Sequence, residues 1–395
     1  MKYLWIIGGG LLQIPVIQEA RRMGFSTIVS DGNARCAAMP YADLFLHMDI
    51  FDIDQHVKWA KQSDNIAGVV ACGIDANVTA SHIAEAIGTP AASPEVARIC
   101  HNKHEFRKAT RLLGYPTPEY YVVDKSPYYL GEGCWIVKNT DNSGSRGTTI
   151  VDGGFCDSFR DTAIKRAIEA SKSGLAIIEE RYFGTEHTIE TCIQDGEFFP
   201  CFITDRLFDY SSGYPVETGL RHPSTLPQYV QRKAYELAQE LAWDLGIDNS
   251  PFKLDIMVTD DGIRIMEATT RWSGGFDCQY LVPYATGKNI IRVAIQLATG
   301  QPIDGELLED KLSLVGVTGS IFPEAGHKIT KIDDSEARRV DGVKEIFWRY
   351  KMGDTIEPYI DCARRVNFII CTGTTEEKAY EILSEAKNKI ILEAE

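Results

Sequence analysis

Residues 252 to 271 restrict the fold more than any other segment of the chain. They read FKLDIMVTDDGIRIMEATTR, two apolar runs around a D-G pair, and this pattern predicts an antiparallel β-hairpin. A three-residue loop of 260 to 262, with its glycine in the left-handed conformation, pairs Asp255 with Glu267. The hairpin is therefore expected to place two carboxylates directly opposite each other.

Two facing carboxylates need a compensating charge. Paired side chains have Cβ atoms about 4.5 to 5.5 Å apart, where like charges are destabilising. A Mg²⁺ ion that bridges Asp255, Glu267 and phosphate oxygens is the natural compensation, because Mg²⁺ uses few carboxylates and adds phosphate ligands. Thr269 and Arg271 continue the same face of the strand at every second residue. The glycines at 274 and 275 then remove side chains beside them, which an ordinary exposed hairpin does not explain.

The composition is that of an ordinary globular protein. With 395 residues the chain exceeds what one core usually supports, so two or three domains are expected. The net charge of −15 argues against a nucleic-acid partner, and the first apolar run is broken by three glycines and too short to span a membrane. The ten cysteines form no C-x-x-C pair, as expected for reduced thiols. We expect a soluble cytoplasmic protein without a membrane partner.

The first part of the chain reads as an α/β domain. Strand and helix signals alternate over residues 1 to 92, which predicts a Rossmann-like parallel sheet with helical crossovers. Two prolines and a helix start at Ser93 mark its end. A single helix is expected over residues 94 to 114.

The rest of the chain reads as α+β. A second D-G hairpin at 187 to 205 joins the one described above in a region of 93 to 300, of which about 114 to 181 forms a subdomain. Short strands and a closing helix at 375 to 390 predict a small C-terminal lobe over 301 to 395.

Two glycine-rich loops are candidates for phosphate binding. Gly8 and Gly10 follow a strand and open a helix, with Asp31 at the end of the next strand, which resembles a dinucleotide fingerprint. The third glycine of that fingerprint is missing, and Gln13 stands there. The second loop, 143 to 147, follows a strand that ends at a lysine, and its amides and hydroxyls can wrap anionic oxygens.

A third segment carries two acids, and because carboxylates repel phosphate, its ligand is expected to be another part of a nucleotide. Glu179 and Glu186 follow an apolar strand and lie seven residues apart in IIEERYFGTEH. At the base end of a nucleotide, such acids can accept hydrogen bonds from an exocyclic amine and from ribose hydroxyls.

These motifs, in this order and over most of the chain, resemble the ATP-grasp superfamily in its carboxylate-amine ligase branch, which includes carbamoyl-phosphate synthase, biotin carboxylase and the L-amino acid ligases. The resemblance implies an ATP-grasp fold between the α/β domain and the C-terminal lobe. It implies contacts to ATP phosphates from Lys103, Lys138, Ser143, Gly144, Ser145 and Gly147. It implies adenine contacts from Glu179 and the Tyr182 backbone, a ribose contact from Glu186, and Mg²⁺, or Mn²⁺, on Asp255, Glu267 and Thr269. Relatives usually carry Glu-x-Asn-x-Arg, and Thr269 replaces the asparagine here.

The same resemblance implies an activity. An ATP-dependent ligase would turn a carboxylate into an acyl phosphate and then form an amide with an amine, with Arg271 and Lys138 as the catalytic residues. The resemblance nominates as substrate contacts Glu217, Arg221, His222, Arg271, Gly274 and Gly275. The expected substrates are amino acids. A homodimer is the default expectation for the assembly. Two alternatives stay open: an NAD-dependent oxidoreductase that uses the first glycine turn, and an ATP-binding relative without ligase activity.

Overall fold

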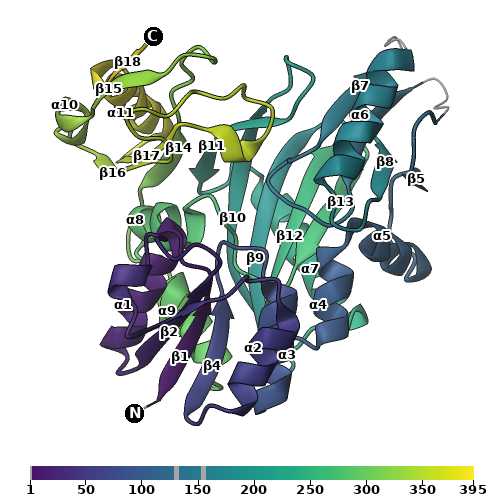
Figure 1. Ribbon diagram of the computed structural model, residues 1–395, viewed down its shortest axis with the longest axis vertical. Helices are drawn as coiled ribbons and strands as arrows, with labels where there is room; N and C mark the ends of the chain where they lie inside the picture. Colours follow the sequence, from purple (N-terminus) through teal and green to yellow (C-terminus); the bar gives the residue numbers. More distant parts are fainter. Residues whose placement is uncertain (1, 129–132, 153–156) are drawn as a thin grey trace.

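The computed structural model describes residues 2–128, 133–152 and 157–395. The N-terminal part is a parallel sheet in the order β3-β2-β1-β4, at the foot of Figure 1. Its strands are β1 (Tyr3–Ile7), β2 (Ser26–Asp31), β3 (Leu44–His47) and β4 (Ile66–Ala71), and its helices are α1 (Ile14–Arg22), α2 (Ile53–Lys61) and α3 (Asn77–Ile87). The expected parallel α/β fold is confirmed, although β3 and α3 were not anticipated.

Both faces of this sheet are covered. Leu4 and Ile6 pack in one buried cluster, whereas Trp5 and Ile7 pack in another with residues of α2 and α3. Successive side chains of a strand point to opposite faces, so a strand covered on both sides reads as a continuous apolar run.

The predicted helix over 94 to 114 is two helices. α4 (Pro94–His101) and α5 (Lys103–Leu112) meet at Asn102, whose extended backbone ends the first helix. The Asn102 side chain accepts hydrogen bonds from the amides of His104 and Glu105 and so caps the second helix. The break places Lys103 at the first position of α5.

An antiparallel sheet follows in the order β5-β8-β6-β7. Its strands are β5 (Tyr120–Val123), β6 (Cys134–Asn139), β7 (Thr149–Asp152) and β8 (Ala176–Glu180), and α6 (Asp157–Ala170) packs on it through a buried cluster that includes Val137, Ile164 and Ile178.

The largest sheet runs through the middle of the molecule in the order β13-β12-β9-β10-β11-β14-β17-β16. Its members are β9 (Thr185–Gln194), β10 (Glu197–Asp209), β11 (Val216–His222), β12 (Ser250–Thr259), β13 (Gly262–Thr269), β14 (Val315–Gly319), β16 (Val343–Trp348) and β17 (Asn367–Gly373). The sheet thus continues across residue 300. One face packs on α7 (Gln228–Asp244), a helix that was not anticipated.

The β12–β13 hairpin pairs Asp255 with Glu267 as expected, but its loop and register differ from the prediction. Asp255 pairs with Glu267, but Thr259 pairs with Gly262, so the loop is the two residues 260–261 rather than three. A β-bulge at Met266 supplies the extra residue and restores the register. Two-residue loops are the commonest hairpin connection, and the sequence carries no signal for the bulge.

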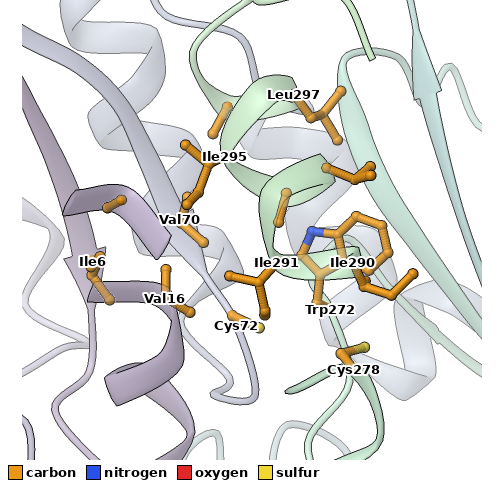
Figure 2. Packing of buried hydrophobic residues seen from close by; sticks show 14 of the residues in the cluster. Ile6, Val16, Val70, Cys72, Trp272, Cys278, Ile290, Ile291, Ile295 and Leu297 are labelled. Atoms are coloured by element: carbon orange, nitrogen blue, oxygen red, sulfur yellow. The ribbon is translucent and has the colours of Figure 1, made fainter. Parts of the chain in front are cut away.

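A shared core joins the N-terminal sheet to the large one (Figure 2). Ile6 and Val70 of the parallel sheet pack in one buried cluster with Ile291 and Ile295 of α9 (Ile290–Ala298). At Gly68 on β4, a Cβ would lie 2.2 Å from the Ala298 carbonyl oxygen, so the glycine allows the two backbones to approach.

The remaining elements complete the C-terminal part. They are α8 (Val282–Thr286), α10 (Ser335–Arg338), α11 (Glu376–Lys389) and the small sheet of β15 (Ile329–Asp333) and β18 (Ile391–Ala394). The predicted closing helix corresponds to α11. Within the described ranges, no helix has the length and apolar character needed to cross a membrane, and the nine cysteines found there are free thiols.

Candidate active site

A cavity of about 40 Å³ collects side chains from five parts of the chain. Five predicted site residues line it: Lys103, Ser143, Glu267, Thr269 and Arg271. Asp75 and Lys253, which were not predicted, line it too. The α4–α5 break, the loop from 143 to 147 and the end of β13 therefore meet at one place.

The two facing carboxylates are already surrounded by cations. Asp255 is buried and accepts from Lys253 at 2.6 Å and from Arg206 at 3.1 Å. Glu267 is more open, with 41% of its side chain exposed, and lies 3.8 Å from Lys103. Burial raises the pKa of Glu267, but Lys103, Lys253 and other cations outweigh it and lower the pKa. The expectation of a net repulsion between Asp255 and Glu267 is wrong, because these cations compensate the two negative charges.

The donor set nevertheless fits a hard divalent cation. Two carboxylates at paired positions and the hydroxyl of Thr269 on the same face are oxygen ligands of the kind that Mg²⁺ prefers. Lys253 pairs with Thr269 across the hairpin, and its ammonium donates to Asp255 at 2.6 Å.

Arg206 joins three acids that the sequence treated separately. Its guanidinium lies 3.0 Å from Glu217, 3.1 Å from Asp255 and 3.8 Å from Glu186. Glu186 also accepts a hydrogen bond from the Tyr210 hydroxyl, and burial raises the pKa of its carboxyl. The predicted ribose acid and metal acid thus share one cation.

Lys138 is buried in an ion-pair chain. Its ammonium lies 2.8 Å from Glu179, and Arg107 binds the other oxygen of the same carboxylate at 2.6 Å. Burial raises the pKa of Glu179, but the two cations lower it to about 2. Both oxygens of Glu179 are therefore occupied, and its adenine role stays a prediction.

The loop from 143 to 147 has the backbone that its glycines permit. Gly144, Ser145 and Gly147 have φ angles of +66°, +60° and +69°. A Cβ at Gly147 would lie 2.6 Å from the Cβ of Ala170, so this glycine also lets the loop pack on α6.

The loop is bonded on three sides. Ser143 donates its hydroxyl hydrogen to Asp75, Lys103 donates to the carbonyl of Asn142 at 2.7 Å, and the Cys362 amide donates to the carbonyl of Gly144 at 3.0 Å. These contacts come from the N-terminal sheet, α5 and the C-terminal part.

The residues nominated on β11 lie apart from this cavity. Glu217 binds Arg365 at 3.0 Å as well as Arg206, and Arg221 binds Asp205 at 3.2 Å and Glu376 at 2.8 Å. His222 lines a separate cavity of about 390 Å³ with residues of α7 and of the 286–314 segment. Burial lowers its pKa to about 4.

Of the two glycines after Arg271, Gly275 has a backbone explanation. It has a φ angle of +77° and precedes Phe276 at +71°, so the chain turns there through two left-handed residues. At Gly274 a Cβ would make an ordinary contact, 3.6 Å from the Gly73 carbonyl oxygen, so the backbone does not require glycine at this position. Their substrate role stays a prediction.

The chain has known relatives over its whole length. Residues 321–395 match the family model described as L-amino acid ligase C-terminal domain 2. The formate-dependent phosphoribosylglycinamide formyltransferase of Sulfurisphaera tokodaii is 25% identical over 410 residues, covering 99% of this chain and 97% of that protein. The crystal structure of L-amino acid ligase from Bacillus licheniformis has a TM-score of 0.84 at 18% identity and covers 100% of this chain and 99% of that one.

The biotin carboxylase domain of 2-oxoglutarate carboxylase from Hydrogenobacter thermophilus, solved with MgADP, has a TM-score of 0.74 at 15% identity and covers 100% of this chain and 91% of that one. This chain has the ATP-grasp fold of these proteins. The resemblance inferred from its motifs is thereby confirmed.

The N-terminal glycine turn is closed by side chains of the protein itself. Asp31, the ribose acceptor of the dinucleotide alternative, accepts from the Gly9 amide at 2.7 Å. Gln13 accepts from the Gly10 amide at 2.8 Å. The amides that would cradle a pyrophosphate are bonded to protein atoms, which disfavours the NAD-dependent alternative.

Tyr182 lies in the segment between β8 and β9 and was predicted to contact adenine through its backbone. Its ring centroid lies 5.7 Å from the guanidinium carbon of Arg264 on β13. The contact packs the segment against the hairpin that carries the predicted metal ligands, and the adenine role stays a prediction.

Sequence reasoning missed several residues of the site. Lys253 lies two residues before Asp255 on β12, so strand alternation could have found it. Arg206 pairs with Glu186 across β9 and β10, which the second hairpin pattern also contained. Asp75 follows the carboxyl end of a parallel strand, a usual position for ligand contacts.

A pair of buried acids lies beneath the site and was also missed. Glu190, Asp277 and Cys278 have ligand atoms within 4.8 Å of one another. Glu190 accepts from the Ser273 amide at 3.1 Å, and its other oxygen has no hydrogen-bond partner among the described residues. Burial and the neighbouring Asp277 raise the pKa of Glu190 to about 8, so it holds a proton at neutral pH.

Proposed function

We propose that this protein is an ATP-dependent ligase that joins a carboxylate to an amine, with amino acids as its substrates. One observation carries the proposal: a single cavity brings Lys103, Ser143, Glu267 and Arg271 together, with Asp255 paired to Glu267. Cations, loop amides and facing carboxylates are the parts that phosphoryl transfer requires.

Each part has a task in this reaction. Mg-ATP, when bound, supplies the phosphoryl group and neutralises its charge. Lys103 and Lys138 hold phosphate oxygens, the loop from 143 to 147 covers them and excludes water, and Asp255 and Glu267 offer metal ligands. Arg271 holds the substrate carboxylate. An oxygen of that carboxylate bonds to the γ-phosphorus as ADP leaves, and the amine nitrogen then bonds to the acyl carbon as phosphate and a proton leave.

The choice of amino acids rests on the match of residues 321–395 to the L-amino acid ligase domain. A second candidate has support from the relative in Sulfurisphaera tokodaii, 97% of whose length aligns with this chain. That protein is named a formate-dependent phosphoribosylglycinamide formyltransferase. In that case formate is the carboxylate, and the amine carries a phosphorylated sugar. We also propose a homodimer located in the cytoplasm.

Release of ADP and phosphate tests the proposal and separates the two candidates. The protein is incubated with Mg-ATP and either pairs of the twenty common amino acids or formate plus glycinamide ribonucleotide. Turnover with amino acid pairs alone supports the first candidate, and turnover with formate alone replaces it with the second. AMP as the main product would contradict the acyl-phosphate mechanism, and binding of NAD without Mg-ATP would contradict the ligase.

A further inference from the structure

Asp75 places a negative charge among groups suited to bind anions. One of its oxygens accepts from Arg271 at 2.7 Å and 3.2 Å, and the other accepts from the Ser143 hydroxyl. Burial raises the pKa of Asp75, but Arg271 and Ser143 lower it to about 2, so the group is a carboxylate at neutral pH. A fixed acid in such a place repels a phosphate and competes for the donors that would bind it.

Asp75 and Arg271 belong to one rigid unit. On one side of Asp75, the Gly73 amide donates to the Trp272 carbonyl at 3.0 Å. On the other side, the Asn77 side chain donates to the Thr270 hydroxyl at 3.2 Å. The loop of Asp75 is therefore bonded at both ends to the segment that carries Arg271.

Ser143 belongs to a different unit. It lies in the loop between β6 and β7 of the sheet that α6 covers. The hydrogen bond from Ser143 to Asp75 therefore holds this loop against the N-terminal part of the molecule.

The cavity between the two units is too small for ATP. Its volume is about 40 Å³, whereas small-molecule sites usually measure about 300 to 1,000 Å³. The loop must move away before a triphosphate enters. Ser143 can then bind phosphate only if its hydroxyl leaves Asp75.

We propose that Asp75 is a positioning residue that holds Ser143 and Arg271 in the empty enzyme in place of an anionic ligand, and that the phosphates of ATP take Ser143 from it. The ATP part of this inference rests on the proposed function. The internal carboxylate lowers the affinity for Mg-ATP and keeps the loop closed while the site is empty.

Isothermal titration with Mg-ATP tests the competition. Asp75→Asn keeps the size of the side chain but removes its charge, so the dissociation constant should fall about tenfold or more, in line with the strength of hydrogen bonds to charged groups. In a Ser143→Ala background the same change should give a clearly smaller gain, because the competed hydroxyl is gone and only Arg271 is then released from the carboxylate. Asp49→Asn, which removes a charge from the same part of the molecule without touching Ser143, is the matched control.

Three results of the titration would overturn the inference. They are an unchanged affinity in Asp75→Asn, an equal gain in the Ser143→Ala background, and an equal gain in Asp49→Asn. The last two would mean that only long-range charge acts. If the wild type binds no Mg-ATP, the proposed function fails instead, and the competition for ATP fails with it.

Limited trypsin digestion without nucleotide tests the closed loop independently of ATP. Arg146 is exposed within the loop, so cleavage after it reports how often the loop opens. Asp75→Asn and Ser143→Ala should each speed this cleavage severalfold, while Asp49→Asn should not. Ser143 lies in a loop outside the core, so Ser143→Ala is expected to fold. This variant therefore still tests the loop contact if Asp75→Asn fails to fold. Equal cleavage rates in Ser143→Ala and the wild type would contradict the loop contact.

Discussion

Lys138 and Glu179 illustrate how a buried ion pair ties binding to stability. Lys138 was predicted to contact ATP phosphates, and the structure buries it with Glu179. Among the described residues, Arg107 is the ion-pair partner that Glu179 keeps when Lys138 is removed. Removal of one member of a buried pair leaves an uncompensated charge, which typically costs about 3 to 5 kcal/mol.

Lys138→Ala should therefore lower the free energy of unfolding by about 3 kcal/mol, at the lower end of that range because Arg107 stays. Urea denaturation measures this change. Lys138→Arg, which keeps a cation beside Glu179 and leaves the Arg107–Glu179 pair intact, is the matched control and should recover most of the loss. A loss of less than about 1 kcal/mol in Lys138→Ala would mean that the pair is effectively solvated.

Glu267 leads to a revised prediction of the same kind. Two bare carboxylates would favour Glu267→Gln in the metal-free protein, but the surrounding cations lower the pKa of this carboxyl. A lowered pKa contributes stability above the ordinary pKa of the group, and this contribution is lost as the pH falls.

Glu267→Gln should thus lower stability in EDTA at pH 7 by no more than about 1 kcal/mol, because 41% of the side chain is exposed and screened. Turnover in excess Mg²⁺ should fall by about 100-fold or more, because a ligand of the metal is lost. Thermal melting and ADP release measure the two effects. Wild-type turnover in this variant would overturn the metal assignment.

At the scale of elements, the break between α4 and α5 determines where Lys103 lies. A continuous helix over 94 to 114 fits the apolar periodicity, but Asn102 has a side chain that caps a helix start, and the Lys103 amide bonds to the Thr140 carbonyl at 2.7 Å. Two helices therefore meet at the phosphate loop.

Asn102→Ala should cost about 1 kcal/mol of stability through the lost cap. It should also raise the KM for ATP severalfold, because Lys103 at the first position of α5 loses its fixed backbone. Asn102→Asp keeps the capping oxygen and should retain stability. Chemical denaturation and ATP titrations of the two variants check both effects. Equal KM values for ATP in Asn102→Ala and Asn102→Asp would mean that the helix cap does not affect ATP binding.

At the scale of the whole molecule, the acid pair beneath the site makes stability depend on pH. Glu190 has an ordinary pKa of 4.5 and a pKa of about 8 in the folded protein. Between these values the folded protein holds a proton that the unfolded chain has lost, so stability falls as the pH rises from about 4.5 to about 8.

Glu190→Gln removes this titration and should flatten the pH dependence. Its urea midpoint should exceed that of the wild type at pH 9 and approach or fall below it at pH 5. Glu197→Gln, at the exposed start of β10, is the matched control and should follow the wild type. Parallel curves for Glu190→Gln and the wild type would contradict the raised pKa.

Local patterns could predict much of this molecule. The parallel N-terminal sheet, both hairpins and the facing of Asp255 and Glu267 follow from periodicity and turn residues. The partners of these residues could not be predicted in the same way. Asp75 meets Ser143 and Arg271 only because three distant segments converge in space, and α7 was overlooked between two strong strand signals.

The bulge at Met266 also bears on how freely this chain can vary. Arg107 donates to the carbonyl oxygens of Ile265 and Met266 at 3.2 Å and 2.5 Å, so a helix outside the hairpin holds the bulge in place. The bulge that pairs Asp255 with Glu267 is thus held by a contact away from the turn at 260–261. We therefore expect insertions or deletions at the exposed turn to leave the facing carboxylates in register, so that loop length can drift in evolution without loss of the predicted metal ligands.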